Sequence, residues 1–159
     1  MNALSHSILL AEDDESDVFL LRRAFKEVGL TNPVHVVADG QAAIDFLTQA
    51  KSREDERMPA LILLDLKMPR RTGLQVLQWI REQPLLRSLP VFIFSSSENR
   101  NDVENAYDGG ATAYLIKPPS LAERADLARF LKDWLRTVQP GLSVSESVRA
   151  AQAQRALRG

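Results

Sequence analysis

The sequence predicts an α/β fold in which five parallel strands form one sheet with helices on both faces. Two observations carry this prediction. Short apolar runs alternate along the chain with longer segments of helical period, and three of these runs are almost continuously apolar. Strands that are buried on both faces, as in a parallel sheet covered by helices, have this pattern. With right-handed crossovers, we expect a flavodoxin-like doubly wound sheet with the strand order 2-1-3-4-5.

The predicted strands and helices follow one another in strict alternation. The strands are expected at residues 8–11, 34–37, 60–64, 91–94 and 113–116. The helices have apolar faces within residues 18–28, 42–47, 74–81, 96–108 and 127–138. Gly29 ends the first helix, Pro84 follows the third, and a glycine pair at 109–110 stops the fourth. Ser96 and Ser97 are interpreted as cap residues of the fourth helix.

The chain of 159 residues is long enough for one domain with a tail. We expect the domain at residues 1–138 and the tail, which forms a short helix or a dimerisation arm, at residues 139–159. The apolar face of the fifth helix covers roughly 140°, more than the ~100° needed to dock on one sheet. Either a second chain or the folded-back tail would cover the excess. We expect a homodimer through this face, because a two-fold dimer is the commonest assembly.

The composition excludes several classes of site. The chain has 20 Lys and Arg residues against 21 Asp and Glu residues, which argues against a basic nucleic-acid or membrane-surface protein. It contains no cysteine, which excludes disulfides, cysteine-ligated zinc, iron–sulfur clusters and thiol nucleophiles. No apolar run approaches the ~18 residues of a membrane span, and residues 1–7 lack the features of a secretory signal. We therefore expect a cytoplasmic protein.

Polar and charged residues follow four of the predicted strands. Glu12 and Asp13 follow the first strand, Asp65 the third, Ser95 the fourth and Lys117 the fifth. In an open α/β sheet these strand ends meet at one edge, where the strand order reverses. Three carboxylates, a hydroxyl and an amine are therefore expected to lie close together. Taken alone, an acidic pair after a strand is also typical of a turn or helix cap, and Asp14 is interpreted in that way.

The three carboxylates would repel one another without a cation between them. Two unit charges about 4 Å apart cost about 4 kcal/mol at an effective dielectric constant of about 20. Oxygen ligands without Cys or His favour Mg²⁺, with Mn²⁺ as a substitute. One carboxylate can also act as a nucleophile and accept a phosphoryl group. A cation, an ammonium group and a hydroxyl would then stabilise the charge of that group.

These residues and their surroundings resemble the receiver domain of bacterial two-component response regulators over about residues 6–136. The motifs are Glu12-Asp13, the segment Leu-Leu-Asp-Leu-Lys-Met-Pro at 63–69, Ser95, and Lys117-Pro118. Asp65 precedes Ser95 by 30 residues and Lys117 by 52, which is the characteristic spacing of the family. Four segments are similar to single-domain receivers that serve phytochrome-type sensor kinases: the acidic segment at 11–17, Val-Ala-Asp-Gly at 37–40, the charged loop at 51–57 and Leu-Asp-Leu-Lys-Met-Pro-Arg at 64–70.

The resemblance implies a stand-alone response regulator that switches conformation to signal to a partner. Asp65 would attack a phosphohistidine of a sensor histidine kinase, for example a bacteriophytochrome, and become an aspartyl phosphate. Asp13, Asp65 and the backbone carbonyl of Lys67 would hold Mg²⁺ directly, and Glu12 would do so through a water. Such a protein is not an enzyme, because it catalyses only its own Mg²⁺-dependent phosphorylation and dephosphorylation.

The same resemblance implies a phosphoryl-binding and switch group. Ser95 and Lys117 would bind the phosphoryl oxygens, and Tyr114 would swing inward when Ser95 moves, although simple packing also explains a tyrosine at that position. The family usually has Thr where Ser95 stands. Lys67 places a cation two residues after Asp65, and our hypothesis is that it hinders the attacking water and prolongs the phosphorylated state. A cis peptide bond between Lys117 and Pro118 is also implied.

Two other classes of function stay open at this point. A phosphatase of the haloacid-dehalogenase type also uses a strand-end aspartate, a lysine and Mg²⁺. It would need a second acid two residues after the nucleophile, where this chain has Lys67. A degenerate receiver that acts as a constitutive interaction module is the other alternative. A nucleotide-binding enzyme is disfavoured, because no glycine-rich phosphate loop follows the first strand.

Overall fold

The computed structural model describes residues 7–52 and 58–137 and confirms the predicted fold class. The strands are β1 (Ile8–Ala11), β2 (Val34–Val37), β3 (Leu61–Leu64), β4 (Val91–Ser95) and β5 (Ala113–Ile116). The helices are α1 (Glu15–Glu27), α2 (Gly40–Ser52), α3 (Gly73–Glu82), α4 (Arg100–Asp108) and α5 (Leu121–Thr137). All strand pairs are parallel, and the sheet has the predicted order β2-β1-β3-β4-β5.

Backbone contacts divide the chain into two units. The first consists of Met1–Val18 and Asn32–Lys117 and contains the whole sheet with α2, α3 and α4. The second consists of Phe19–Thr31 and Pro118–Gly159 and contains most of α1 and all of α5. Every residue that the sequence predicts for the site belongs to the first unit, so the site can be described within it.

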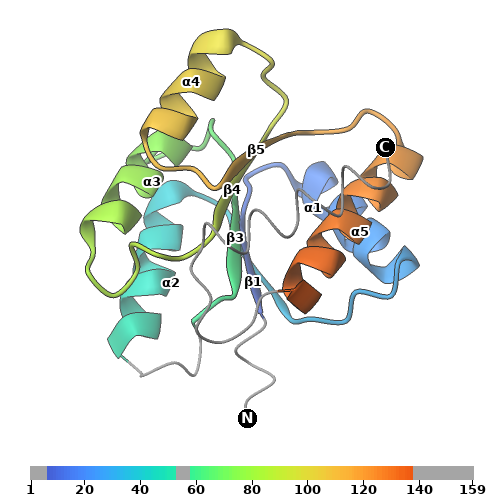
Figure 1. Ribbon diagram of the computed structural model, residues 1–159, viewed down its shortest axis with the longest axis horizontal. Helices are drawn as coiled ribbons and strands as arrows, with labels where there is room; N and C mark the ends of the chain where they lie inside the picture. The colour runs from blue at the N-terminus through green and yellow to red at the C-terminus, as the bar shows by residue number, and fades with distance from the viewer. Residues whose placement is uncertain (1–6, 53–57, 138–159) are drawn as a thin grey trace. The chain divides into compact units, whose positions relative to one another are not determined.

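The apolar core of the first unit lies between one face of the sheet and the helices α2, α3 and α4 (Figure 1). Its fully buried members are Leu9, Ala11, Ala43, Leu47, Ile62, Leu64, Val76, Leu77, Ile80, Leu86, Val91, Ile93 and Ala106. Burying one such aliphatic side chain larger than alanine contributes about 1.5–3 kcal/mol, so this core holds the strands firmly in register. In that register Ala11 pairs with Leu64, which places Glu12 and Asp65 at the same edge.

The second unit shows how the predicted end of α1 forms. Gly29 has a φ of 75°, and the N–H of Leu30 donates to the carbonyl of Phe25 over 2.9 Å. This is the Schellman arrangement, in which a glycine in the left-handed region satisfies the last carbonyls of a helix. The amine of Lys132, in α5, also donates to the carbonyl of Val28 over 2.7 Å. The prediction that Gly29 ends the first helix is therefore confirmed.

Some local predictions need correction. Helix α4 begins at Arg100 and not near Ser96, because Asn99 is its N-cap and accepts a hydrogen bond from the N–H of Asn101. The cap role predicted for Ser96 and Ser97 is therefore wrong. No peptide bond in the described residues is cis, so the bond between Lys117 and Pro118 is trans, the form that is favoured by about 0.5–1 kcal/mol even before proline.

Other predictions fall outside the described residues. These are the tail at 139–159, most of the charged loop at 51–57, and Val138 on the face of the fifth helix. None of the helices in the described part of the chain combines the length and the apolar character that a membrane span requires.

Candidate functional site

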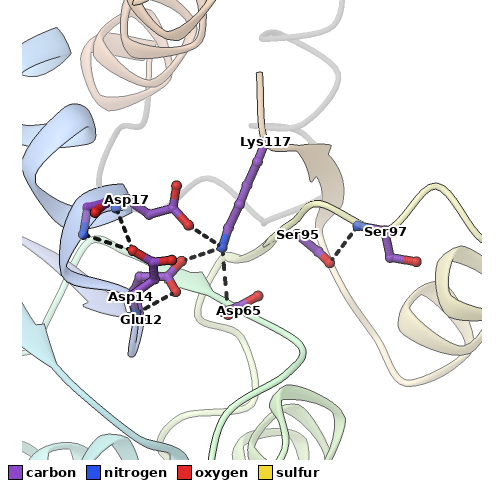
Figure 2. A network of polar contacts seen from close by, with 8 residues as sticks. Glu12, Asp14, Asp17, Asp65, Ser95, Ser97 and Lys117 are labelled. Carbon is purple, nitrogen blue, oxygen red and sulfur yellow. Dashed lines mark hydrogen bonds and ion pairs between the residues drawn. The ribbon is translucent and has the colours of Figure 1, made fainter. Parts of the chain in front are cut away.

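The carboxyl ends of four strands bring the predicted site residues together. Figure 2 shows Glu12 after β1, Asp65 after β3, Ser95 at the end of β4 and Lys117 after β5. The β1 and β3 strands are neighbours in the sheet but not in the chain, so the strand order reverses between them. This is the position at which doubly wound sheets form their binding sites. The predicted gathering of these residues is confirmed.

Glu12, Asp13 and Asp65 form an acidic cluster in which one oxygen of each carboxylate lies within 4.8 Å of the others. Glu12 and Asp65 are buried, whereas Asp13 is exposed. Burial raises the pKa of Glu12 to about 7, and the charge of Asp65 adds to this rise. Burial also raises the pKa of Asp65, although Lys117 opposes the rise. Without a metal ion, the cluster therefore retains a proton near neutral pH.

The Lys117 amine lies beside this cluster (Figure 2). Its Nζ is 2.7 Å from Glu12 Oε1 and 3.7 Å from Asp65 Oδ2, and 5.6 Å from the centroid of the Phe94 ring. Burial alone would lower the pKa of the amine, but its contacts with Glu12 and Asp17 and the charge of Asp65 raise it above its usual value. The amine is therefore a permanent positive charge next to Asp65.

Asp17 is a site residue that the sequence did not reveal. Its Oδ2 accepts a hydrogen bond from Lys117 Nζ over 2.9 Å. An acid in the first turn of a helix is usually explained by the helix dipole, which hides any other role. The one available signal is spacing, since Asp17 stands one helical turn after Asp13. Asp14 has the predicted cap role, because its Oδ1 accepts hydrogen bonds from the N–H groups of Ser16 and Asp17.

Ser95 and Tyr114 both contact Ser97, the residue that lies in the loop after β4. The Ser95 hydroxyl is buried and accepts a hydrogen bond from the N–H of Ser97 over 3.1 Å. The Tyr114 hydroxyl donates to the carbonyl of Ser97 over 2.7 Å, and the Tyr114 ring packs partly buried against the core. One residue therefore links the serine at the site to the tyrosine on β5.

The loop between β3 and α3 is fixed immediately after Asp65. The N–H of Gly73 donates to the carbonyl of Leu66 over 2.8 Å, and a Cβ at Gly73 would lie 2.2 Å from the carbonyl oxygen of Asp65. Thr72 caps α3 and forms a capping box with Gln75. Lys67, within this loop, is exposed. The loop holds Asp65 in place while the Lys67 side chain stays in solvent.

The donor set fits a hard divalent cation. All three members of the acidic cluster offer carboxylate oxygens, which Mg²⁺ and Mn²⁺ prefer. Because Asp13 is exposed, water can reach the cluster and complete the octahedral shell that Mg²⁺ requires. The side chains that could hold a metal ion are thus Glu12, Asp13 and Asp65, and the part of the Lys67 carbonyl in the metal site stays a prediction.

Comparison with known proteins identifies the family. The sequence pattern of the response regulator receiver domain matches residues 8–132. The response regulator Rcp1 of Synechocystis sp. (strain PCC 6803) is 34% identical over 132 residues, which cover 82% of this chain and 90% of Rcp1. The crystal structure of the Mn²⁺-bound form of Rcp1 matches with a TM-score of 0.74 and 33% identity, over 84% of this chain and 97% of that chain.

Two further solved structures are similar. The phosphorylated cyanobacterial phytochrome response regulator RcpA matches with a TM-score of 0.74 and 30% identity, over 83% of this chain and 94% of that chain. The bacteriophytochrome response regulator RtBRR matches with a TM-score of 0.68 and 35% identity, over 96% of this chain and 94% of that chain. By sequence and by fold, this chain belongs to the response regulator receiver domain family, the signalling modules of two-component systems.

Proposed function

We propose that this chain is a stand-alone response regulator that accepts a phosphoryl group on Asp65 from a histidine kinase and switches conformation to signal to a partner. The observation that carries the proposal is the position of the Asp65 carboxylate, within the acidic cluster and 3.7 Å from the Lys117 amine. A carboxylate in this position is a nucleophile with an ammonium group and a cation site beside it. Phosphoryl transfer requires such positive charge around the transferred group.

The transfer replaces one bond to phosphorus by another. An Asp65 oxygen forms a bond to phosphorus, the phosphorus–nitrogen bond of the donor phosphohistidine breaks, and its electron pair stays on the imidazole. Asp13, Asp65, the Lys67 carbonyl and Glu12 would hold Mg²⁺, or Mn²⁺ in its place. When bound, the ion supplies positive charge to the phosphoryl oxygens. Dephosphorylation is the attack of water on the same phosphorus, so the chain catalyses no reaction beyond its own modification.

The loss of the hydrogen bond between Ser95 and Ser97 would carry the effect of phosphorylation from Asp65 to Tyr114. Ser95 now accepts a hydrogen bond from Ser97, and Tyr114 donates one to the carbonyl of the same residue. When the Ser95 hydroxyl turns to a phosphoryl oxygen, it gives up its bond to Ser97. The loop after β4 is then free to shift, and Tyr114 shifts with it. The switch is therefore a two-state equilibrium that the phosphoryl group biases.

The relatives support a kinase of the phytochrome type as the donor. RcpA is a phytochrome response regulator and RtBRR a bacteriophytochrome response regulator. The match covers 90% of the length of Rcp1, which supports a receiver domain at 1–138 followed by a tail.

We also propose a homodimer through the face of α5. In this helix Leu131 and Trp134 are buried, whereas Leu127 and Phe130 are half-buried. The part of the apolar stripe that retains solvent exposure is therefore the part that carries Leu127 and Phe130. A second copy of the chain would cover it.

The proposal is tested by phosphorylation with a small donor. The protein is incubated with acetyl phosphate and Mg²⁺, and the intact mass is measured. We expect a gain of one phosphoryl group that is stable in acid and labile in base, and that chelation of Mg²⁺ prevents. Asp65→Asn abolishes the gain, because the amide is not a nucleophile.

The matched control is Asp45→Asn, which removes an exposed carboxylate on α2. This variant takes up the phosphoryl group like the wild type. Uptake by Asp65→Asn at the wild-type rate, or no uptake by the wild type, contradicts the proposal. Catalytic turnover of the donor without a modified protein would indicate the phosphatase alternative instead.

A further inference from the structure

We infer that Asp17 is a positioning residue that directs the Lys117 ammonium group towards the phosphoryl group on Asp65. The inference rests on the proposed function and adds to it a residue outside the acidic cluster. Asp17 lies in the first turn of α1, and Lys117 follows β5. Figure 2 shows the Lys117 amine between Asp17 and Asp65. The fold thus brings a fourth carboxylate to the amine.

Asp17 contacts the amine from outside the acidic cluster. Lys117 Nζ donates to Asp17 Oδ2 over 2.9 Å. Glu12 Oε1 is closer, at 2.7 Å, and forms an ion pair with the same amine. Asp65 Oδ2, at 3.7 Å, is beyond hydrogen-bond range. Asp17 and Glu12 therefore hold the amine together, and Asp17 is the one of the two that does not belong to the acidic cluster.

One hydrogen of the amine is then available to the reaction. An ammonium group has three N–H donors in a tetrahedral arrangement. Asp17, at 2.9 Å, and Glu12, at 2.7 Å, occupy two of them, and the third is left for an acceptor near Asp65 (Figure 2). A phosphoryl group on Asp65 places oxygens in the space between Asp65 and the amine. Asp17 therefore prepares a donor for an oxygen that arrives only with the phosphoryl group.

A bound cation makes this role more important. Glu12 and Asp65 belong to the acidic cluster, and a metal ion there would share their charge and repel the Lys117 amine. Asp17 is not part of the acidic cluster, so it remains a counter-charge of the amine when the metal site is filled. The side chains of Asp17 and Lys117 are 18% and 10% exposed, so solvent screens their contact only weakly. Asp17 then keeps the amine from moving away.

The first test measures phosphorylation of the full chain by acetyl phosphate at saturating Mg²⁺. We expect Asp17→Ala to lower the saturating rate by about tenfold, the usual effect of losing one hydrogen bond between charged groups. The donor concentration at half-saturation stays unchanged. Asp17→Asn retains an oxygen acceptor but not the charge, and restores part of the rate. Glu15→Ala removes an exposed acid from the same helical turn and has no effect.

Two results of this test overturn the inference. One is a wild-type rate for Asp17→Ala. The other is an equal loss in Asp17→Asn and Asp17→Ala, which would mean that the charge of Asp17 matters and its direction does not. Circular dichroism of each variant checks that it folds, and Asp17→Asn, which keeps the size of the side chain, provides the comparison if Asp17→Ala does not.

The second test does not depend on phosphorylation. In nitrogen-15 NMR spectra of the metal-free protein, a held ammonium group exchanges its protons slowly and gives a signal. We expect the Lys117 signal in the wild type and in Glu15→Ala, and its loss in Asp17→Ala. An unchanged signal in Asp17→Ala overturns the inference. If the expected signals are seen but the wild type takes up no phosphoryl group, the proposed function fails and the positioning of Lys117 by Asp17 stands.

Discussion

Glu12 and Asp65 are carboxyl groups that the sheet buries at the same edge, and their protonation depends on burial more than on any single neighbour. In the unfolded chain Glu12 loses its proton near its usual pKa of 4.5, whereas the folded protein without metal keeps the proton until a pKa of about 7. The folded state thus binds more protons than the unfolded state between these values. The stability that the protonated group contributes is complete below pH 4.5 and is lost as the pH rises to about 7.

This linkage predicts a pH profile for the metal-free protein. In the presence of a chelator, we expect the melting temperature of the wild type to fall more steeply than that of Glu12→Gln as the pH rises from about 5 to about 7.5. The glutamine keeps the shape of the side chain but cannot titrate. Glu15→Gln, which changes an exposed acid three residues later, follows the wild-type profile. Parallel profiles for wild type and Glu12→Gln would show that Glu12 does not hold the proton.

Lys67 is the residue that we expect to set the lifetime of the phosphorylated state. It is exposed and stands two residues after Asp65, on the loop between β3 and α3. We expect Lys67→Asn to release phosphate severalfold faster than the wild type, because the shorter amide leaves more room for water. Arg70→Asn, which removes a cation farther along the same loop, has no effect. Equal release rates for wild type and Lys67→Asn would remove the hypothesis.

At the scale of elements, the loop between β3 and α3 explains how a short strand presents its aspartate in a fixed position. Gly73 lies against the backbone of Asp65, where a Cβ would approach the carbonyl oxygen to 2.2 Å. Its neighbour Thr72 caps the helix through its side chain. The same turn therefore serves two purposes. The Thr72 side chain caps α3, and the Gly73 backbone lies against Asp65 and supports the site.

These two contacts predict different results at adjacent positions. We expect Thr72→Ala to lower the free energy of unfolding by about 1 kcal/mol, the usual cost of a lost N-cap, and to leave phosphorylation intact. Gly73→Ala displaces the backbone of Asp65, so it lowers the free energy of unfolding by at least about 2 kcal/mol and also slows phosphorylation. Urea unfolding and the rate with acetyl phosphate measure both effects. Normal phosphorylation in Gly73→Ala would show that the loop does not position Asp65.

The elements also show where sequence patterns are informative and where they fail. Apolar runs located all five strands to within one residue. The pattern is clearest for β1, β3 and β4, which are buried along their whole length, because strands buried on both faces tolerate few polar residues. The start of α4 was misplaced because Ser96, Ser97 and Asn99 are all good cap residues, and only the fold decides which one is used. Gln75 as the partner of Thr72 was missed for the same kind of reason, since the capping box involves side chains that are common elsewhere.

On the scale of the whole molecule, the sequence predicted those site residues that follow strands. Asp65 and Lys117 are 52 residues apart, but the order of the strands brings their ends together. Asp17 was missed because it reaches the same amine from a helix, and helical spacing alone does not show which side chain turns to a neighbouring strand. The rule that sites form at the carboxyl ends of parallel strands therefore finds the residues that follow strands. Site residues on helices are found only once the three-dimensional structure is known.

The proposed homodimer is a property of the whole molecule and has its own test. Light scattering after size exclusion, over a range of protein concentrations, is expected to show a dimer for the wild type. Phe130→Arg places a charge in the half-buried part of the α5 stripe and gives a monomer that retains the circular dichroism of the folded wild type. Arg129→Ala, at an exposed position of the same helix, leaves the dimer intact. A wild-type monomer at every concentration, with or without acetyl phosphate, contradicts the dimer.

The Asp65 carboxylate is the proposed phosphorylation site, and chemical mapping of the modified residue tests this most directly. The phosphorylated wild type is reduced with borohydride, which converts an acyl phosphate of aspartate to homoserine, and the digested protein is sequenced by mass spectrometry. The account predicts homoserine at position 65 and at no other aspartate, and none at all without Mg²⁺. Homoserine at Asp13 or Asp17 with an unchanged Asp65 would contradict it.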